Sequence, residues 1–179
     1  MPAKSLDVEF KLLENCRLCP RNCQVNRLDG KLGYCKAGPE FQIASISVHK
    51  GEEPAISGEK GICNVFFSHC NLQCIYCQNY QISRKECRIN DQYQSLDEIV
   101  HAIKNILDRG IESLGFVSPS HMVPQMMAII RALREKGYFP YVIYNTNAYD
   151  SVEILRMLED WVDVYLPDFK YADRDLSQK

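Results

Sequence analysis

The sequence predicts an α/β protein built around parallel strands and preceded by a cysteine-rich segment. Short apolar runs typical of buried strands alternate with longer amphipathic stretches typical of helices. Polar or reactive residues follow each of these runs, as they do at the carboxyl edge of parallel sheets. We expect a cysteine-rich N-terminal segment over residues 1–50 and an α/β domain over residues 51–179.

The composition is that of an ordinary globular protein. Of the 179 residues, 46% are apolar and 25% are charged, and the net charge of -2 leaves no footprint of nucleic-acid binding. No apolar run approaches the length of a membrane span, and the N-terminus lacks the apolar core of a signal peptide. Nine cysteines in tight clusters suit metal ligation better than disulfides, so we expect a reducing, cytoplasmic location.

The N-terminal segment contains a predicted short helix over residues 6–15 and then a cysteine knuckle. This knuckle is loop-rich and cannot bury enough apolar surface to fold alone, so a bound metal would supply the missing stabilisation. Its cysteines are Cys16, Cys19, Cys23 and Cys35. Zinc and a second iron–sulfur cluster both fit four thiolates, and thiols that merely pack against the main domain are the alternative. A strand with one buried face is predicted at residues 41–48.

The remaining elements alternate in type along the chain. Strands are predicted at residues 62–67, 113–117, 140–144 and 162–166, and helices at 95–107, at 122–136 and from about 150. The first of these helices has the clearest start, because Ser95 and Glu98 form a capping box. Ser120 and Asp150 are expected to cap the other two helices.

The chemistry is predicted to centre on Cys70, Cys74 and Cys77, which follow the apolar run 65–67. Thiolates at C-x3-C-x2-C spacing can converge on one metal centre. Three ligands leave one position open, both in a zinc site and in a cubane cluster. An iron–sulfur cluster is favoured. Zinc with His69 as fourth ligand fits less well, because adjacent residues of an extended chain point in opposite directions. Unligated core thiols are the remaining alternative.

Polar loops after the other strands should join the three cysteines in one site, because the carboxyl ends of parallel strands share one edge. These loops contain Ser118, Pro119, Ser120 and His121, then Asn145, Thr146 and Asn147, and finally Asp168 and Lys170. Ordinary turn and capping residues are the alternative interpretation, with Asp168 and Lys170 as a surface ion pair of little energetic value.

The cysteine motif, with Tyr76 before its last cysteine, resembles the signature of the radical S-adenosylmethionine (SAM) superfamily. Residues 52–58 and 64–80 are similar to its branch of iron–sulfur proteins related to the pyruvate formate-lyase activating enzyme. The resemblance runs from about residue 16 to residue 170. It implies a partial (β/α) barrel of six units, of which only four are present, so the barrel is apparently truncated. Either the chain is a fragment, or a partner or the N-terminal segment covers the open sheet edge.

The resemblance also implies an oxidoreductase activity. A [4Fe-4S] cluster held by the three cysteines would bind SAM at its open iron and be reduced by an electron donor of the flavodoxin or ferredoxin type. SAM would then be cleaved to methionine and a 5′-deoxyadenosyl radical, which takes hydrogen from a substrate such as a glycyl radical enzyme. The cofactors carry the difficult chemistry, and the protein positions the reacting atoms.

Residue roles follow from the same resemblance. Tyr76 matches an aromatic residue near the adenine. Ser118, Pro119 and Ser120 stand where many members bind the SAM amino group with a Gly-Gly-Glu-Pro motif, but they supply no carboxylate, so hydroxyls or backbone carbonyls must serve.

Two further sets match the activating enzymes. Asn145, Thr146 and Asn147 resemble a Thr-Asn-Gly motif that contacts ribose. Asp168 and Lys170 match an Asp-x-Lys pair with a catalytic role, in which Lys170 pairs with the SAM carboxylate. A non-enzymatic zinc or iron–sulfur module that organises an interaction surface is the alternative function.

Overall fold

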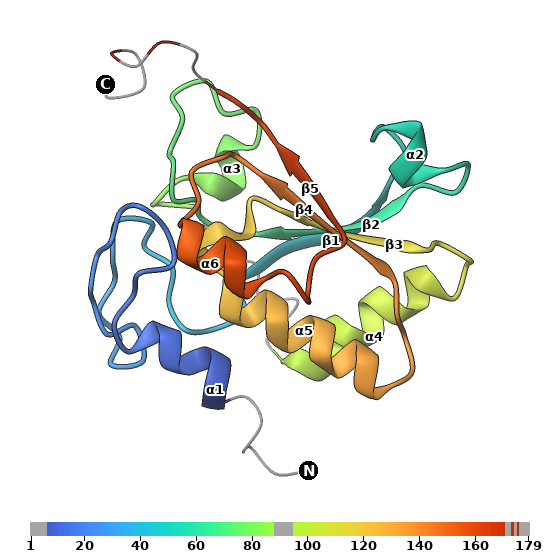
Figure 1. Ribbon diagram of the computed structural model, residues 1–179, viewed down its shortest axis with the longest axis horizontal. Coiled ribbons are helices and arrows are strands. Elements are labelled where there is room, and N and C mark those ends of the chain that lie inside the picture. The colour runs from blue at the N-terminus through green and yellow to red at the C-terminus, as the bar shows by residue number, and fades with distance from the viewer. Residues whose placement is uncertain (1–6, 88–94, 171–172, 174, 176–179) are drawn as a thin grey trace.

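A five-stranded sheet lies at the centre of the computed structural model, which describes residues 7–87, 95–170, 173 and 175 (Figure 1). The strands lie side by side in chain order. They are β1 (Ile43–His49), β2 (Ile62–Phe67), β3 (Ser113–Val117), β4 (Tyr141–Thr146) and β5 (Val164–Pro167). Strands β2 to β5 are parallel, and β1 pairs antiparallel with β2. The predicted α/β class with a largely parallel sheet and a cysteine-rich N-terminal region is confirmed.

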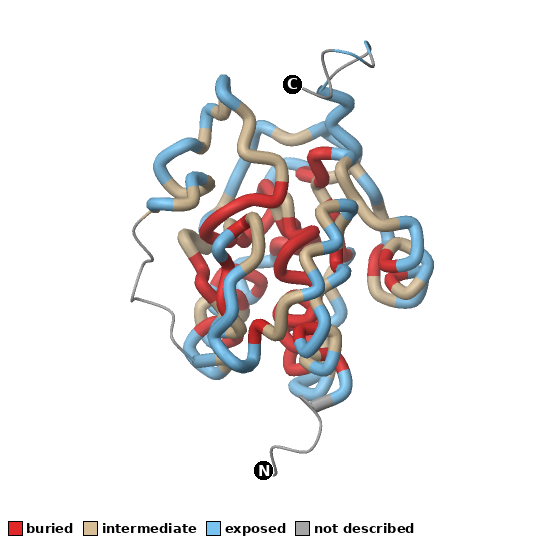
Figure 2. The backbone as a smooth tube through the Cα atoms, turned by 90° about the vertical axis from the view of Figure 1, so that its left-hand side faces the viewer, coloured by how far each residue is buried: buried red, intermediate tan, exposed pale blue. Residues whose placement is uncertain are grey.

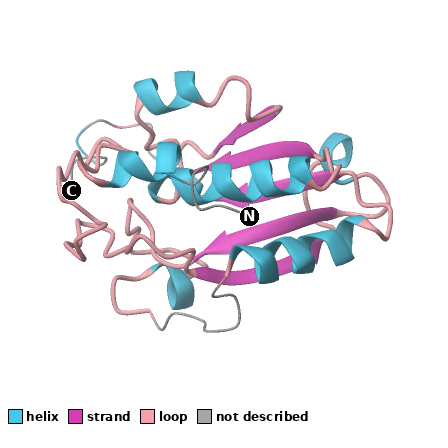
Figure 3. Ribbon diagram, turned by 90° about the horizontal axis from the view of Figure 1, so that it is seen from below, coloured by secondary structure: helices cyan, strands magenta, loops and turns pink. Residues whose placement is uncertain are grey.

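The helices are α1 (Asp7–Phe10), α2 (Pro54–Ser57), α3 (Tyr80–Ser83), α4 (Leu96–Leu107), α5 (Val123–Glu135) and α6 (Val152–Met157), with 3-10 turns η1 (Lys11–Leu13) and η2 (Pro119–His121). Helices α4, α5 and α6 lie between successive parallel strands, and α4 and α5 flank one face of the sheet. Helices α4 and α5 contact each other and lie on the same side of the sheet (Figures 1 and 3). Figure 2 shows the buried residues concentrated in the middle of the molecule.

Helix α4 forms as its sequence predicts. The Ser95 hydroxyl accepts a hydrogen bond from the backbone N–H of Glu98, and the Glu98 carboxylate accepts one from the backbone N–H of Ser95. This reciprocal pair is the predicted capping box, which satisfies two otherwise unpaired donors of the first turn. The apolar stripe of the helix then enters the core through Ile99 and Ile103, both of which are fully buried.

The two faces of the sheet have different surroundings because strand side chains alternate. Val65 of β2 and Phe116 of β3 point into the core that the helices cover, and both are fully buried. Asn64, Phe66 and Val117 lie on the opposite face, where they line a cavity instead. The face opposite α4 and α5 is therefore the one available for a ligand.

The N-terminal segment is attached to this core. Leu13 of η1, Leu18 and Ala37 are buried in the same hydrophobic cluster as the sheet residues. Glu9 of α1 is buried and pairs with Arg131 of α5. Because β1 pairs with β2, the N-terminal segment covers that edge of the parallel strands. At the other edge, β5 has no further strand beside it among the described residues.

Three local predictions differ from the structure. Strand β4 runs on to Thr146, two residues beyond its predicted end, because it stays in register with β3 and β5. Ser120 does not cap α5. It lies inside η2 and is fully buried, and the N-terminus of α5 has no side-chain cap. Asp150 does not cap α6 either, because its carboxylate accepts hydrogen bonds from the hydroxyls of Tyr144 and Thr146.

The predicted helix at residues 6–15 is present as α1 and η1. Its first residue falls outside the described residues.

Candidate active site

A cavity of about 660 Å³ lies on the face of the sheet opposite α4 and α5 and reaches the carboxyl ends of the parallel strands. All four parallel strands or the loops that follow them contribute to it. The predicted site residues that line it are Cys70, Cys74, Tyr76, Cys77, Ser118, Asn145, Asn147, Asp168 and Lys170. The structure thus brings together four sets of residues that are separated by up to a hundred positions in sequence.

Three predicted site residues do not line the cavity. Ser118 has a left-handed backbone with φ of 48°, which turns the chain sharply at the end of β3. Pro119 and Ser120 therefore continue into η2 and are buried away from the cavity. Thr146 is also buried, because its side chain points to the opposite face from that of Asn145 and bonds Asp150. The structure therefore does not bring Pro119, Ser120 and Thr146 to the cavity that the other predicted site residues line.

Cys70 is the most buried of the three motif cysteines, with a relative exposure of 9%. Its sulfur accepts a hydrogen bond of 3.4 Å from the backbone N–H of Leu72. The side-chain amide of Asn147 also reaches this sulfur, at 3.5 Å. N–H groups that point at a sulfur stabilise its thiolate, so the surroundings of Cys70 suit a metal ligand.

The other two motif cysteines are half-buried at the wall of the cavity. Burial raises the pKa of Cys74, and the neighbouring thiols of Cys70 and Cys77 raise it further, whereas Lys170 lowers it. Cys77 accepts a hydrogen bond of 3.3 Å from the hydroxyl of Ser83 in α3. The three thiols are therefore close enough to influence one another, and a bound metal would replace their protons.

The loop between the motif cysteines is held in place by side-chain hydrogen bonds to backbone carbonyls. The side chain of Gln73 donates hydrogen bonds to the backbone carbonyls of Cys70 and Ser83. His69 faces away from the cavity, with Nδ1 3.3 Å from the carbonyl of Arg84 and 3.5 Å from the sulfur of Cys87. His69 is thus not placed to complete a metal site with the three motif cysteines.

The residues present fit a metal centre with three protein ligands. Three thiols face one cavity that is large enough for a cluster and a further ligand, and donors already point at two of the sulfurs. Within the described part of the chain, no three His, Cys, Asp or Glu side chains are already arranged to hold a metal ion. The thiol side chains must therefore turn toward one another on binding.

A group of three polar residues beside the cavity face of β2 was not predicted from the sequence. Asn64 donates a hydrogen bond of 3.2 Å to Glu52, which also lies 4.0 Å from His49. All three line the cavity at the amino end of β2, away from the cysteines. The signal was weak, because Glu52 belongs to a loop and His49 to a different, antiparallel strand. Only the pairing of β1 with β2 brings them together.

Comparison with known proteins now identifies the family. The model of the radical SAM superfamily matches residues 64–179, and the chain therefore belongs to that superfamily. The uncharacterized protein MJ0674 of Methanocaldococcus jannaschii is 27% identical over 178 residues, which are 97% of this chain and 51% of that protein. The chain spans about half the length of this relative. No solved structure matches the chain significantly.

Membership of the superfamily agrees with the site. It implies a [4Fe-4S] cluster and SAM, and Cys70, Cys74 and Cys77 lie within the matched residues. No helix in the residues that the structure describes is both long and apolar enough to cross a membrane.

Proposed function

We propose that this protein is a radical SAM enzyme of the activating-enzyme type, with a cluster at Cys70, Cys74 and Cys77. The observation that carries the proposal is the convergence of these thiols with residues that follow β3, β4 and β5 in one cavity. When bound, the reduced cluster and SAM together supply a 5′-deoxyadenosyl radical that can take a hydrogen atom from a substrate. The protein then has to bind, orient and shield the reacting groups.

The side chains around the cavity suit the parts of SAM. Lys170, held by Asp168 at 2.5 Å, offers a positive charge for the SAM carboxylate. Asn145 offers an amide for the ribose hydroxyls, and Tyr76 a ring for the adenine. Ser118 takes the place of the missing carboxylate, since its hydroxyl and carbonyl can accept from the ammonium group.

We assign the opposite end of the cavity to the substrate. Glu52 and Asn64 lie on the inner face of the sheet at the amino end of β2, where they can bond a polar group that enters beside SAM. A partly buried pair of donor and acceptor fixes orientation at little cost, because each group already has one partner.

The substrate we propose is a polypeptide segment of a glycyl radical enzyme. Large apolar side chains flank cavity residues and yet are exposed, with Ile75 at 95% and Phe169 at 78%. Exposed apolar groups next to a polar cavity favour contact with a protein surface. A small acidic electron donor of the flavodoxin or ferredoxin type would reduce the cluster. Because the chain spans half of its relative, these partners are proposals for the whole protein.

The cluster and the catalysis are tested in separate steps. Protein purified without oxygen should be brown and contain iron and sulfide, and Cys74→Ala should lose both, while Cys63→Ala, a buried cysteine outside the cavity, should keep them. With dithionite and SAM, the wild type should form 5′-deoxyadenosine and methionine. A colourless wild type that contains no iron would refute the proposal, and a cluster without SAM cleavage would favour a non-enzymatic module.

The substrate needs its own experiment. Wild-type protein, SAM and a reductant are incubated with pyruvate formate-lyase, and electron paramagnetic resonance is used to detect a glycyl radical. A glycyl signal that depends on Cys74 would support the activase assignment. Formation of 5′-deoxyadenosine without such a signal would reject pyruvate formate-lyase as the substrate and leave the radical SAM chemistry intact.

A further inference from the structure

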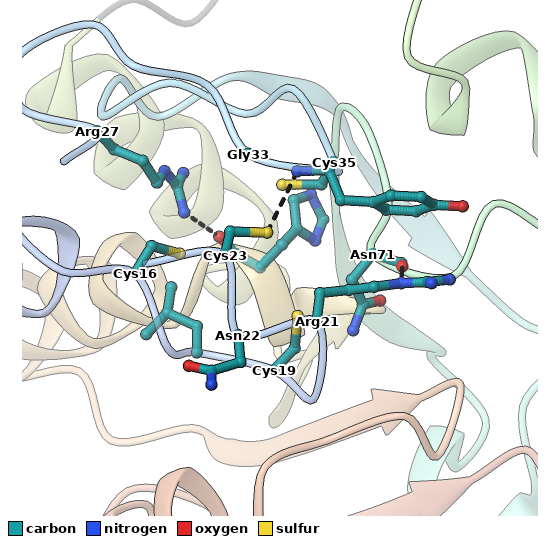
Figure 4. A pocket seen from close by; sticks show the side chains of 12 residues that line it. Cys16, Cys19, Arg21, Asn22, Cys23, Arg27, Gly33, Cys35 and Asn71 are labelled. Atoms are coloured by element: carbon teal, nitrogen blue, oxygen red, sulfur yellow. Dashed lines mark hydrogen bonds between the residues drawn. The ribbon is translucent and has the colours of Figure 1, made fainter. Parts of the chain in front are cut away.

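The cysteine knuckle at the N-terminus surrounds a second, much smaller pocket. Figure 4 shows Cys16, Cys19, Cys23 and Cys35 around it, together with Arg27. The cavity has a volume of about 10 Å³, which is room for about one water-sized guest. Its size suits a single ion better than a cubane cluster.

The backbone of the knuckle is shaped to present these thiols. Asn22 and Gln24, on either side of Cys23, both have positive φ, at 45° and 55°. Asn tolerates this left-handed conformation, whereas it is unfavourable for Gln24 and persists there only where the surroundings fix it. A Cβ atom on Gly33 would lie 2.9 Å from the sulfur of Cys23, so only glycine leaves room for this thiol. The backbone N–H of Tyr34 donates to the same sulfur at 3.3 Å.

Arg27 is a buried cation that lacks a counter-charge. It is 1% exposed, and its guanidinium donates to the carbonyls of His121 and Gly38 and to the sulfur of Met122. Its Nε has no hydrogen-bond partner, and among the described residues it forms no ion pair with a carboxylate. A buried charge with only neutral partners is costly, so a negatively charged group in the pocket or in its wall would stabilise Arg27.

We propose that Cys16, Cys19, Cys23 and Cys35 bind one Zn²⁺ ion as a tetrahedral tetrathiolate site. Four thiolates and one divalent cation carry a net charge of -2, which the guanidinium groups of Arg27 and Arg21 at the pocket wall balance. The sulfurs turn inward when the ion binds, and zinc takes the place of their four protons. No electron is transferred in this step.

The state of the free thiols agrees with this exchange. Burial raises the pKa of Cys19 to about 11, and it also raises the pKa of Cys35. The charges of neighbouring cysteines raise both pKa values further.

Zinc at the knuckle would also steady the loop that carries the motif cysteines. Arg21 lies between Cys19 and Cys23, and its guanidinium donates to the carbonyls of Asn71 at 3.1 Å and Leu72 at 3.4 Å. Its other face stacks on Tyr34 at 3.8 Å. This supporting role rests on the proposed function, whereas the zinc site itself does not.

The test separates the two metal sites. Zinc, iron and sulfide are measured in the wild type and in a variant with Cys70, Cys74 and Cys77 all changed to alanine, in which the motif cannot hold a cluster. We expect one zinc per chain in both proteins. Adding Cys19→Ser and Cys23→Ser should abolish zinc, whereas Cys87→Ser, a control at a half-exposed cysteine outside the pocket, should not. Cobalt in place of zinc should show the visible bands of tetrahedral thiolate ligation.

Other results would overturn the proposal. Iron and sulfide that remain in the triple alanine variant and disappear with Cys19→Ser and Cys23→Ser would assign the knuckle to a second iron–sulfur cluster. If the wild type holds no metal at the knuckle, its four thiols only pack against the main domain. A cysteine variant could lose zinc because it misfolds, so Arg27→Met, which keeps all four cysteines, provides a second test. Removal of zinc should lower the Tm of the wild type by on the order of 10 °C. The decrease should be clearly smaller in Arg27→Met, and an equal decrease would contradict the charge argument.

Discussion

The side-chain amide of Asn147 donates a hydrogen bond of 2.9 Å to Oδ1 of Asn71, although the two residues are 76 positions apart. Asn71 lies inside the cysteine motif, and Asn147 follows β4. Asn71 in turn donates to the carbonyl of Tyr149 at 2.8 Å. The loop that carries the motif cysteines is thus joined to the loop after β4, so the position of Cys70 depends on a strand from the other side of the cavity.

Replacement of Asn147 by alanine should therefore weaken both the fold and the cluster. Asn147 is buried and would leave Asn71 with an unpaired acceptor, which costs about 1–3 kcal/mol of unfolding free energy. Iron content should fall as well, because Cys70 loses a donor to its sulfur. Urea unfolding and iron analysis would measure the two effects. Asn26→Ala, which removes an exposed bond to Asp29, is the control and should change neither quantity.

Lys170→Met should impair SAM binding without affecting stability. The pair of Lys170 and Asp168 is largely exposed, and such pairs contribute about 0–1 kcal/mol to stability. If Lys170 binds the SAM carboxylate, the KM for SAM should rise at least about tenfold, or ~1.4 kcal/mol. The assay is 5′-deoxyadenosine formation at several SAM concentrations, with Lys136→Met, at the exposed residue just after α5, as control. An unchanged KM would identify the pair as a surface salt bridge only.

Gly115→Ala should destabilise the inner face of the sheet. A Cβ atom at Gly115 would lie 2.1 Å from Oδ1 of Asn64, so the Asn64 side chain and its bond to Glu52 would have to move. Overpacking of this kind costs about 1–3 kcal/mol. The same change in an Asn64→Ala background should cost clearly less, because the nearest clashing group is gone and only Cδ1 of Ile62, at 2.9 Å, still has to shift. Equal costs in the two backgrounds, measured by thermal unfolding, would rule out this contact as the cause.

Stability should decrease at acidic pH because of His121. Complete burial, together with the charges of Arg27 and His69, lowers its pKa to about 3, and the bond to the carbonyl of Ser68 opposes part of this shift. In the unfolded chain the pKa is about 6.5. The unfolded state therefore takes up a proton below that pH while the native state does not, and stability is lost as the pH falls from about 6.5 towards 3, by at most ~1.4 kcal/mol per pH unit.

The variant His121→Gln would test this assignment. The amide can still donate to Ser68 but does not titrate, so the pH dependence of its unfolding free energy should be shallower by nearly one proton. His101→Gln, at an exposed position on α4, should keep the wild-type slope. Identical slopes in all three proteins would contradict the role of His121.

The sheet could be predicted because its signals are local. The alternation of apolar runs and capped helices marked β2 to β5, and the capping box at Ser95 marked the start of α4 almost to the residue. The convergence of the cysteines with Ser118, Asn145 and Lys170 also followed from chain order, since parallel strands end at one edge.

The remaining features depend on contacts between distant segments. The direction of β1 is set by its pairing with β2, which no local pattern encodes. Asp150 fits a helix cap in sequence, but the hydroxyls of Tyr144 and Thr146 compete for its carboxylate and prevail. The missing counter-charge of Arg27 became visible only when its burial was known, because an arginine in a polar segment normally lies in solvent.

The attachment of β1 and Arg21 to the rest of the protein bears on how the catalytic part can be isolated. A minimal polypeptide that starts at residue 64, where the superfamily match begins, would remove the neighbour of β2 and the guanidinium that holds Asn71 and Leu72. Such a shortened chain would expose the unpaired edge of β2, which can pair with another chain. It would also lose the contacts that hold the loop of Cys70, Cys74 and Cys77. Gene fusions and deletion series should therefore keep the first fifty residues together with the α/β domain.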